Sequence, residues 1–577
     1  MMTFLKGNCF LMKTFFIILV VLFFYICLMI YAQFGKKKKE RLFRQRLKNE
    51  YGSVQYKEYS YERSQSLTGY FDKHVNKDFL IDDISWNDID GERLFRRLNY
   101  CNSSVGEEYL YYRLRHLRFQ MSEEEMESFE KRISSIDVNE EERLNIQLLF
   151  AKLGRCGKYS IFRYLDWLSS VKKRSVLFYW LFLLIYPICF ILMYFEPSLG
   201  VLSIALVLAV RILLHVKERK EIEPYIVSLS YMIRTFQFVD RISKNKTIQE
   251  IWPEESKRLK VLRKEIKGIS SFYMLFLTDS GDSLWDGLMI YLNSLTGFDI
   301  IAFYGMLDKV DKYKAQMDEM ISLLGRMESE ISIASFRKSL PYYCVPDFTK
   351  SVSVSMEEVF HPMLEQPVAN SFSIEKGMLL TGSNASGKST FLKTVEISAI
   401  LAQTIQTVPA QSYKAPFFRI FSSMSLRDSL ESSESYYIVE IKAMKRIFDA
   451  NVKTDVPLLC FVDEVLRGTN TIERISASAE ILSEFSRSGI FAFAATHDLE
   501  LTQILSDIYE NYHFEELVSN DDVTFPYKLL KGPAETRNAI KLLRLMGYPE
   551  QIIEKAERRA VALMTKKVKE NGNINEG

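Results

Sequence analysis

Three uncharged apolar runs interrupt a chain that otherwise mixes hydrophobic and charged residues. The first, residues 14–32, has 19 residues without a charge and as a helix just spans a hydrocarbon core of about 30 Å. The second and third, residues 175–195 and 199–210, are separated by Glu196-Pro197-Ser198, which is a natural turn. The pattern predicts three transmembrane helices, the last two forming a hairpin over 175–216.

Elsewhere the spacing of hydrophobic positions separates a helical part from an α/β part. Leucines recur at three- and four-residue spacing, as at Leu110, Leu114 and Leu117, which is typical of amphipathic helices. After Pro341, short apolar runs alternate with helical ones, which favours an α/β domain. We therefore expect an N-terminal transmembrane anchor (1–35), a cytoplasmic helical region (36–174), a transmembrane hairpin (175–216), a second helical region (217–340) and a C-terminal α/β domain (341–577).

Basic residues flank the apolar runs. A block at 36–48 follows the first run, and the segments 172–174 and 217–220 lie on either side of the hairpin. Because such segments resist translocation, we expect a multi-pass protein of the cell membrane with its N-terminus outside and its bulk in the cytoplasm. A cleaved signal peptide is the alternative for the first run, although that run is long for one. The block at 36–48 also suits anionic membrane lipids, and Arg211 is expected to snorkel to the interface.

Composition disfavours three classes of protein or site. The 577 residues are 47% hydrophobic and 26% charged, which excludes a disordered or low-complexity chain. The 75 basic and 73 acidic residues nearly cancel, which counts against binding of nucleic acid by bulk positive charge. The seven cysteines show no CxxC spacing, so a zinc site or a disulfide framework is not predicted.

A glycine-rich loop follows the strand-like run 378–381. It reads Gly382-Ser383-Asn384-Ala385-Ser386-Gly387-Lys388-Ser389-Thr390 and continues into a helical run over 391–405. This is GxxxxGK[ST] in the strand–loop–helix context that the motif requires. Gly382 and Gly387 let backbone N–H groups face phosphates, and the helix N-terminus attracts them. Lys388 is predicted to bind the β- and γ-phosphates of ATP and Ser389 to ligate Mg²⁺.

Two further strand-like runs end in polar residues. Residues 458–462 are followed by Asp463-Glu464, and residues 490–495 by Thr496-His497-Asp498. We expect the first strand to lie beside the strand that precedes the glycine loop, so that Asp463 supports the Mg²⁺ and Glu464 activates the attacking water. His497 would sense the γ-phosphate at the same carboxyl edge of the sheet. Lys388, Glu464 and His497 are therefore the predicted catalytic residues.

These motifs together resemble the MutS family of DNA mismatch-repair proteins. Phe360-His361-Pro362 and Val368-Ala369-Asn370 resemble the family's approach to its nucleotide site, and 381–390 resembles its P-loop. Asp463-Glu464 with Arg467-Gly468-Thr469-Asn470 resembles its DExxRGT segment, and Thr496-His497 its switch histidine. The tail 525–560 resembles its dimerisation end. The resemblance implies a P-loop NTPase domain of the ABC/MutS type, ATP hydrolysis with Mg²⁺, and a homodimer.

Other segments resemble the family less closely. Asn102-Ser103-Ser104-Val105-Gly106-Glu107 resembles the start of its lever domain, which the hairpin would interrupt. The anchor occupies the end where the family's mismatch-reading domain would stand. Aligned on Val439-Glu440, the loop that reaches the partner's nucleotide reads Ser432-Ser433-Glu434-Ser435-Tyr436. Ser435 keeps the hydroxyl for a contact in trans, whereas Glu434 places an acid where the family has arginine.

The sequence thus predicts a membrane-anchored, MutS-like ATPase whose ATP-driven dimer closure moves helical levers. Two alternatives remain for what the levers act on. The first is mismatched or structured DNA, for which the Lys/Arg-rich run 257–267 is the candidate surface, although acids interrupt it. The second is a membrane partner, with no role for DNA. A non-hydrolysing scaffold is disfavoured by the Asp463-Glu464 pair.

Overall fold

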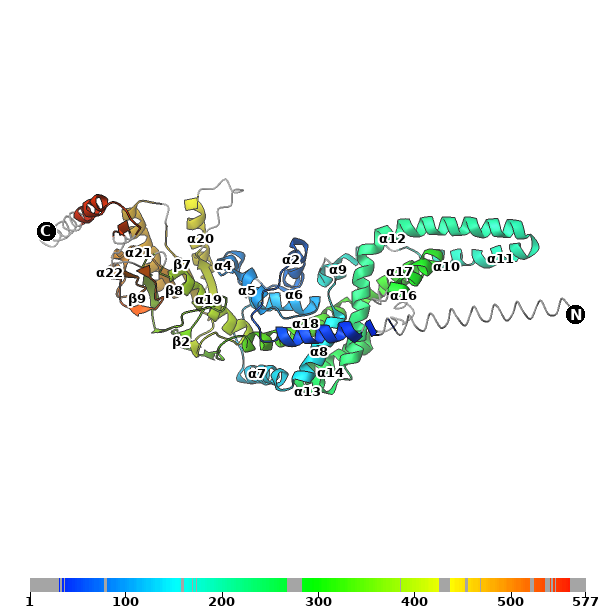
Figure 1. Ribbon diagram of the computed structural model, residues 1–577, viewed down its shortest axis with the longest axis horizontal. Coiled ribbons are helices and arrows are strands. Elements are labelled where there is room, and N and C mark those ends of the chain that lie inside the picture. Colours follow the sequence, from blue (N-terminus) through cyan, green and yellow to red (C-terminus); the bar gives the residue numbers. More distant parts are fainter. Residues whose placement is uncertain are drawn as a thin grey trace.

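The computed structural model describes residues 31, 34–35, 37–76, 80–156, 160–168, 170–172, 174–266, 283–383, 386–424, 436–451, 455–466, 469–518, 523–534, 540, 543–544 and 546–560. The predicted anchor over 14–32 lies outside the described residues except for Tyr31. Figure 1 shows an elongated molecule with an α/β domain at one end, a helical body in the middle and a long helical hairpin at the other end.

The helical body is built from two stretches of sequence on either side of the hairpin. Its helices are α2 (Tyr61–Leu67), α3 (Gly69–His74), α4 (Asp83–Asp88), α5 (Gly91–Leu98), α6 (Ser104–Arg115), α7 (Glu123–Val138), α8 (Glu140–Leu153), α9 (Ile161–Leu168), α13 (Lys246–Ile251), α14 (Pro253–Glu265) and α18 (Lys314–Lys338). Side-chain caps fix several starts. Ser122 and Glu125 form a capping box at α7, and Ser103 accepts from the Gly106 nitrogen at α6.

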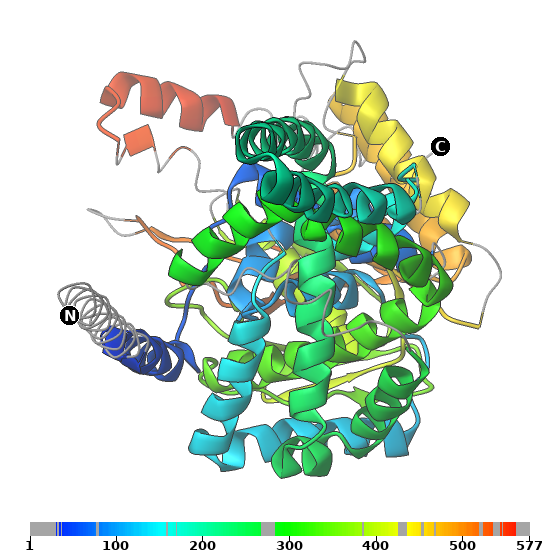
Figure 2. The same ribbon diagram turned by 90° about the vertical axis from the view of Figure 1, so that its right-hand side faces the viewer.

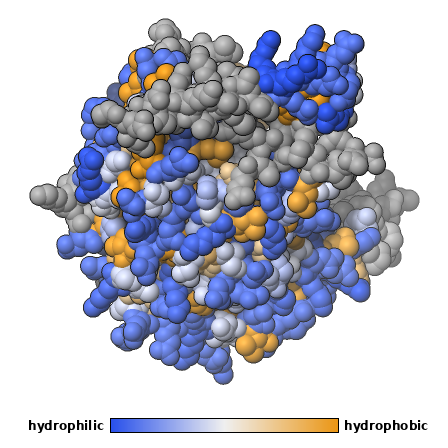
Figure 3. All heavy atoms as spheres, turned by 90° about the vertical axis from the view of Figure 1, so that its left-hand side faces the viewer, coloured by the Kyte–Doolittle hydropathy of each residue, from blue (hydrophilic) through white to orange (hydrophobic). Residues whose placement is uncertain are grey.

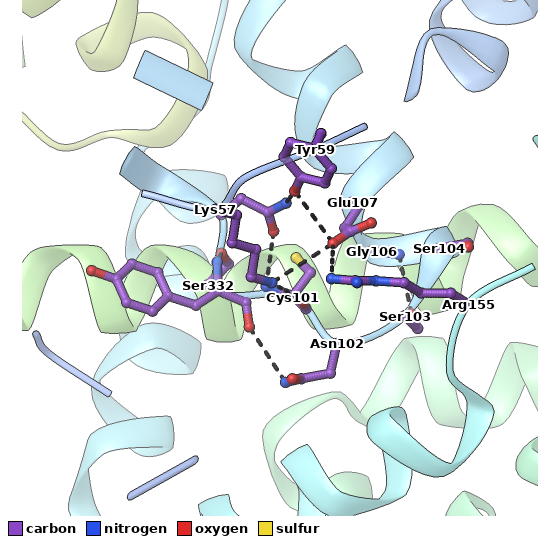
Figure 4. Close-up of polar contacts among 12 residues, drawn as sticks. Lys57, Tyr59, Cys101, Asn102, Ser103, Ser104, Gly106, Glu107, Arg155 and Ser332 are labelled. Carbon is purple, nitrogen blue, oxygen red and sulfur yellow. Dashed lines mark hydrogen bonds and ion pairs between the residues drawn. The ribbon is translucent and has the colours of Figure 1, made fainter. Parts of the chain in front are cut away.

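The segment 102–107, which resembles the start of the family's lever domain, ends in Glu107, and this residue is the centre of a buried ion-pair cluster. Glu107, fully buried on α6, accepts hydrogen bonds from Tyr59 at 3.3 Å and Arg155 at 3.0 Å, and lies 3.7 Å from Lys57 (Figure 4). Burial alone would raise the pKa of Glu107, but Lys57, Arg63 and Arg155 together bring it below its ordinary value. The cluster connects α6 to Lys57, Tyr59 and Arg63, which precede it in the chain, and to Arg155, which follows it. These contacts stabilise the centre of the helical body.

The apolar hairpin consists of α10 (Val176–Leu183), α11 (Ile185–Phe195) and α12 (Pro197–Ile242). Two stretches of it are long and apolar enough to cross a membrane, Val176–Phe195 and Pro197–Glu223. Their side chains are largely exposed, as at Ile188, Phe190 and Leu202, and Figure 2 shows the pair end-on. Of the three predicted spans, the described residues therefore contain the two of the hairpin.

The 46-residue helix α12 continues from the hairpin into the helical body. Figure 1 shows it turning sharply, and Pro224 lies inside it at the end of the apolar stretch. An interior proline removes one backbone hydrogen bond and kinks a helix. Beyond the kink, Leu229, Ile233 and Phe236 are fully buried in the main core. The hairpin is thus rooted in the helical body.

Arg211 does not snorkel as expected. Its side chain is buried, and the guanidinium lies over the rings of Tyr179 and Phe182 at 5.9 and 5.8 Å. Glu218 lies 4.0 Å away. The prediction was wrong because neighbouring helices enclose the side chain, which a hydropathy pattern does not reveal. Two more helices pack against this region, α16 (Ser283–Thr296) and α17 (Phe298–Lys312).

The C-terminal domain contains a six-stranded sheet of order β12-β9-β4-β8-β7-β6, in which only β12 is antiparallel to its neighbour. A four-stranded sheet of order β1-β5-β2-β3 lies beside it. The strands are β1 (Asp347–Phe348), β2 (Val354–Val359), β3 (Asn370–Ile374), β4 (Gly377–Thr381), β5 (Ser412–Ala415), β6 (Arg419–Ser423), β7 (Leu458–Asp463), β8 (Ile490–Ala495), β9 (Tyr509–His513), β10 (Leu517–Val518), β11 (Val523–Thr524) and β12 (Leu530–Lys531). The helices are α19 (Lys388–Ile405), α20 (Tyr436–Ala450), α21 (Thr471–Arg487) and α22 (Glu500–Ile504). Figure 3 views this end of the molecule, where polar side chains predominate and hydrophobic ones are scattered.

Among the contacts between the helical body and the α/β domain, two are buried hydrogen-bond sites. On the sheet edge, Ser85 and Asp88 of α4 accept hydrogen bonds from Ser422 and Met424 at the end of β6. At the end of α18, the Arg337 guanidinium donates to the Thr407 hydroxyl at 2.7 Å, just after α19. Movement of the α/β domain can therefore reach the helices directly through these buried contacts.

Candidate nucleotide site

The glycine loop joins β4, a strand at the centre of the six-stranded sheet, to α19. Gly382 and Gly387 have φ of 138° and 103°, in the region that favours glycine. A Cβ on Gly382 would lie 2.6 Å from the Phe514 carbonyl oxygen, so the loop requires glycine there for space as well. Asn384 and Ala385 lie outside the described residues. The loop therefore leads directly into α19, and the backbone amides of the loop lie at the positive N-terminal end of that helix.

The Lys388 side chain folds back over the glycine loop and is held there by hydrogen bonds to two of the loop's carbonyl oxygens. Its Nζ donates to the carbonyl oxygens of Gly382 and Ser383 at 2.8 and 2.9 Å and lies 3.4 Å from His497 Nε2. The side chain is 2% exposed, so its charge is directed into the site instead of into water. Together with the α19 N-terminus, this ammonium gives the loop a geometry that suits an anion.

Ser389 and Asp463 meet across the sheet. The Ser389 hydroxyl, on the first turn of α19, donates to Asp463 Oδ2 at the end of β7. The sequence predicted β7 beside β4, but this was wrong, because β8 lies between them and pairs with both. The two side chains still reach one another because all three strands end at the same edge. A hydroxyl and a carboxylate are hard oxygen donors of the kind that Mg²⁺ prefers, so the pair fits the predicted metal.

Glu464 and His497 stand at the ends of β7 and β8. His497 Nε2 lies 2.5 Å from Glu464 Oε1, and the Glu464 backbone nitrogen donates to the Ala495 carbonyl at 2.9 Å. Glu464 has φ of 61° and Leu466 has φ of 59°, which are left-handed values that non-glycine residues adopt rarely. Such strained residues cluster at functional sites, and here the Glu464 carboxylate contacts His497 just after β8. Arg467 and Gly468 lie outside the described residues.

Beside the loop is a cavity of about 440 Å³, within the usual range for small-ligand pockets. Gly387 and Ser389 line one side of it, and His361, Phe514 and Tyr527 line others. The Tyr527 ring lies so close to Gly387 that a Cβ there would be 3.0 Å from the ring. Burial lowers the pKa of His361 to about 4, aided by Lys393 and Arg93, so this imidazole is neutral near pH 7. The pocket suits a flat, uncharged group attached to phosphates.

Sequence reasoning missed two residues at this site. Tyr527 is brought in by Asn370, whose side chain donates to the Tyr527 carbonyl at 3.0 Å and accepts from the Leu529 nitrogen at 2.8 Å. Glu516 accepts a hydrogen bond from the Ser383 hydroxyl in the glycine loop. Both follow β9 in the chain, and no spacing pattern connects them to the loop. The signal in the sequence was Asn370, which belongs to the stretch that resembles the family's approach to its nucleotide site and which binds the backbone of Tyr527.

Two predicted elements bear on a second subunit. Ser435 and its neighbours Ser432, Ser433 and Glu434 lie outside the described residues, so the trans contact stays a prediction. Of the segment Asp463–Asn470 that resembles the family, Asn470 caps α21 by accepting from the Ile472 and Glu473 nitrogens at 3.0 and 3.1 Å. In the tail, Met546, Tyr548 and Ile552 are exposed hydrophobic residues, at 75%, 51% and 48%.

The site lies at the carboxyl edge of the six-stranded sheet of an α/β domain. There a glycine loop that carries a lysine faces two carboxylates and a histidine. Residues 378–564 match the family described as MutS domain V. The similarity of this chain to the MutS family therefore lies in its C-terminal domain.

Three relatives, each named DNA mismatch repair protein MutS, illustrate the similarity. The protein of Clostridium kluyveri is 29% identical over 287 residues, which cover 47% of this chain and 32% of the relative. That of Thermosipho melanesiensis is 30% identical over 267 residues, covering 44% and 32%. That of Natronomonas pharaonis is 31% identical over 228 residues, covering 37% and 26%. The chain thus matches about a third of the length of these relatives.

Proposed function

We propose that this protein is an ATPase of the MutS type, anchored in the cell membrane, which couples ATP binding and hydrolysis to dimer closure and to movement of its helical body. The observation that carries the proposal is the meeting of Lys388, Ser389, Asp463, Glu464 and His497 at one edge of the sheet. These five residues come from three separate parts of the sequence, and each lies at the end of a parallel strand or at the start of the helix that follows.

Each residue then has a distinct task. Lys388 and the loop amides hold the phosphates, and Ser389 and Asp463 hold Mg²⁺, which when bound neutralises charge on the phosphate oxygens. Glu464 orients and deprotonates the attacking water, because its carboxylate is turned out of the sheet toward this edge. His497 contacts both Lys388 and Glu464, so it is placed to report the γ-phosphate to the water-activating group.

Dimer formation and membrane anchoring rest on the remaining surfaces. MutS-like ATPases close as dimers, and the exposed Met546, Tyr548 and Ile552 in the tail suit such an interface, with Ser435 reaching the partner's nucleotide. The two apolar stretches of the hairpin support a multi-pass membrane protein. With the first apolar run as a further span, its N-terminus would be outside and its bulk cytoplasmic. Membrane lipids would contact the hairpin and the basic block 36–48.

Two outputs of the ATP-driven movement compete, and one observation favours the membrane. Helix α12 continues, through its kink near Pro224, from the hairpin into the core of the helical body, so a shift of that body is transmitted to the apolar end. The basic run proposed for DNA is less suitable than its sequence indicates. Arg258 pairs with Glu319 at 2.6 Å and Arg263 with Asp240 at 3.1 Å, which partly neutralises two of its charges. DNA binding, to mismatched or structured duplex, is the second candidate.

The test uses the full chain, purified in detergent. The protein should hydrolyse ATP only with Mg²⁺, and Glu464→Gln should lower the turnover number by at least about a hundredfold while ATP is still bound. The matched control is Glu480→Gln, since Glu480 is an exposed acid on α21. Equal turnover in both variants would contradict the proposal.

A second assay separates the two outputs. Mismatched and branched duplexes are titrated at low salt, where contacts with DNA phosphates are strongest. We expect neither binding nor a change in ATPase rate if the membrane is the target. A duplex that binds and accelerates hydrolysis would instead establish the DNA alternative.

A further inference from the structure

Helices α16 and α17 form a bent pair that the hydropathy pattern did not reveal. Residues 287–307 contain a single charged residue, Asp299, in 21 positions. Gly287–Thr296 and Phe298–Lys312 together are long and apolar enough to cross a membrane, but they are bent by 79° at Gly297. At 14 residues, α16 is about 21 Å long, so it reaches partway into a hydrocarbon core of about 30 Å.

The outer face of α16 is apolar and exposed. Leu288, Tyr291 and Leu292, at helical spacing, are 49%, 74% and 37% exposed, and Ile290 beside them is 54% exposed. On the other face Met289 and Asn293 are buried against the protein. By contrast α17 turns back inward, and its Ile300, Phe303 and Leu307 belong to the main core. The geometry is that of an element that enters and leaves on the same side.

The bend lies at the depth of the apolar hairpin. The Tyr186 hydroxyl donates at 2.8 Å to the carbonyl of Leu295, one of the carbonyls left without a helical partner where α16 ends. Tyr186 is ten residues into the 20-residue stretch Val176–Phe195, or about 15 Å from its start. Any membrane that the hairpin crosses therefore surrounds the end of α16 as well. This contact also satisfies a backbone group that lipid could not.

The polar groups at the bend are satisfied by the hairpin. Asp299 is fully buried and lies 2.5 Å from Arg219 and 3.0 Å from His215, both on α12. Gly297, with φ of 71°, lies against Arg211, and an added Cβ would be 1.3 Å from Arg211 Nη2. Charges inside a membrane protein are placed this way, facing other helices and paired. The single charge of the 21-residue run is thus removed from the lipid-facing side.

We infer that α16 is a re-entrant membrane element whose exposed face, Leu288, Ile290, Tyr291 and Leu292, contacts lipid acyl chains. The lipid bilayer is the occupant because this face continues the exposed surface of the hairpin at the same depth. The inference rests on the proposed membrane anchoring and extends it, since the region 217–340 was expected to be wholly cytoplasmic. Lipid-driven movement of α16 would reach the core directly through α17.

Cysteine accessibility in vesicles of phosphatidylethanolamine and phosphatidylglycerol tests this inference. Leu288→Cys and Tyr291→Cys report on α16, Ile191→Cys and Leu202→Cys on the hairpin, and Ile472→Cys on an exposed aqueous site in the α/β domain. A membrane-impermeant maleimide is applied to the full chain, and labelling at each position is read by peptide mass spectrometry. Each rate is normalised to that of the denatured protein. Because a thiol in hydrocarbon does not ionise, we expect α16 and hairpin positions to react at least about tenfold more slowly than the thiol introduced by Ile472→Cys.

The outcomes separate the inference from the proposed function. Fast labelling at 288 and 291 with protection at 191 and 202 overturns the inference and leaves the anchor intact. Fast labelling at all positions overturns both. A fluorophore attached to the thiol of the Tyr291→Cys variant should also be quenched by lipids brominated on their acyl chains. Protection without quenching would assign the face to a protein partner, and protection lost on dilution into excess lipid would assign it to a second copy; either result overturns the inference.

Discussion

His497 Nε2 lies 2.5 Å from Glu464 Oε1, and the same imidazole nitrogen lies 3.4 Å from the Lys388 ammonium. One side chain thus connects Glu464, which we propose activates the attacking water, to Lys388, which we propose binds the phosphates. We expect His497→Ala to lower the ATPase turnover number about a hundredfold and to change ATP affinity only a few-fold, because the imidazole acts on the reaction more than on binding. Steady-state kinetics and a nucleotide-binding titration measure the two effects.

His513 provides the control for this prediction. It stands at the end of the parallel strand β9, on the other side of β4, and its Nδ1 lies 2.9 Å from the Gly532 carbonyl oxygen. His513→Ala should leave the turnover number within about threefold of the wild type. If the two alanine variants lose activity equally, the connecting role of His497 is refuted.

Tyr527 is predicted to contribute to nucleotide affinity. Its ring borders the cavity beside the glycine loop, where a flat group would stack on it. Tyr527→Ala should raise the dissociation constant for ATP about tenfold, whereas Tyr527→Phe, which keeps the ring, should stay close to the wild type. Fluorescence titration with a labelled nucleotide measures both. A Phe variant as weak as the Ala variant would show that the ring is not the binding element.

Asp88 links the helical body to the edge of the six-stranded sheet. It is 1% exposed and accepts from the Ser422 hydroxyl at 2.9 Å and the Met424 nitrogen at 2.8 Å. Asp88→Ala leaves two buried donors without an acceptor, so it should cost about 2–4 kcal/mol of stability. Asp88→Asn should cost less, since it keeps one acceptor and relieves repulsion with Glu396, whose pKa burial and Asp88 raise. Thermal unfolding in detergent measures both, and an alanine variant as stable as wild type would contradict this role.

Glu108 makes stability depend on pH. Burial raises the pKa of this carboxyl from 4.5 to about 8, so the folded protein keeps a proton that the unfolded chain loses above pH 4.5. Stability should therefore fall as the pH rises from about 5 to about 8, by up to about 1.4 kcal/mol per pH unit, and then level off. The melting temperature of Glu108→Gln should fall less between pH 6 and pH 8. Glu127→Gln, at an exposed position on α7, is the control and should behave as the wild type does.

Local features of the site could be predicted from the sequence because they are set within a few residues. A glycine loop between a strand and a helix requires Gly382, Gly387 and Lys388 in fixed order. In the same way, Asp463 and Glu464 directly follow a run of apolar residues that forms a buried strand. The order of strands could not be predicted in the same way. The insertion of β8 between β4 and β7 depends on connections that pass through α20 and α21, and many orders are compatible with the same apolar runs.

At the apolar end of the molecule, too, local features could be predicted from the sequence and packing could not. The hairpin is visible in the sequence because its apolar runs are continuous. The bent pair α16 and α17 was missed because Asn293, Gly297 and Asp299 interrupt the run. Only the packed structure supplies His215 and Arg219 as partners for Asp299, and Tyr186 as the donor to the Leu295 carbonyl. Arg211 was misjudged for the same reason, since burial between aromatic rings depends on neighbouring helices.

The sequence by itself determined the candidate site residues of this protein and its apolar segments, because motif spacing and hydropathy act over short stretches of chain. Tertiary structure alone decided which residues meet. It brought Ser389 to Asp463, Tyr527 to Gly387, and Asp88 to the end of β6, each across more than 70 residues. Such contacts depend on strand order and helix packing, where the net balance of burial and chain entropy over the whole domain selects one arrangement.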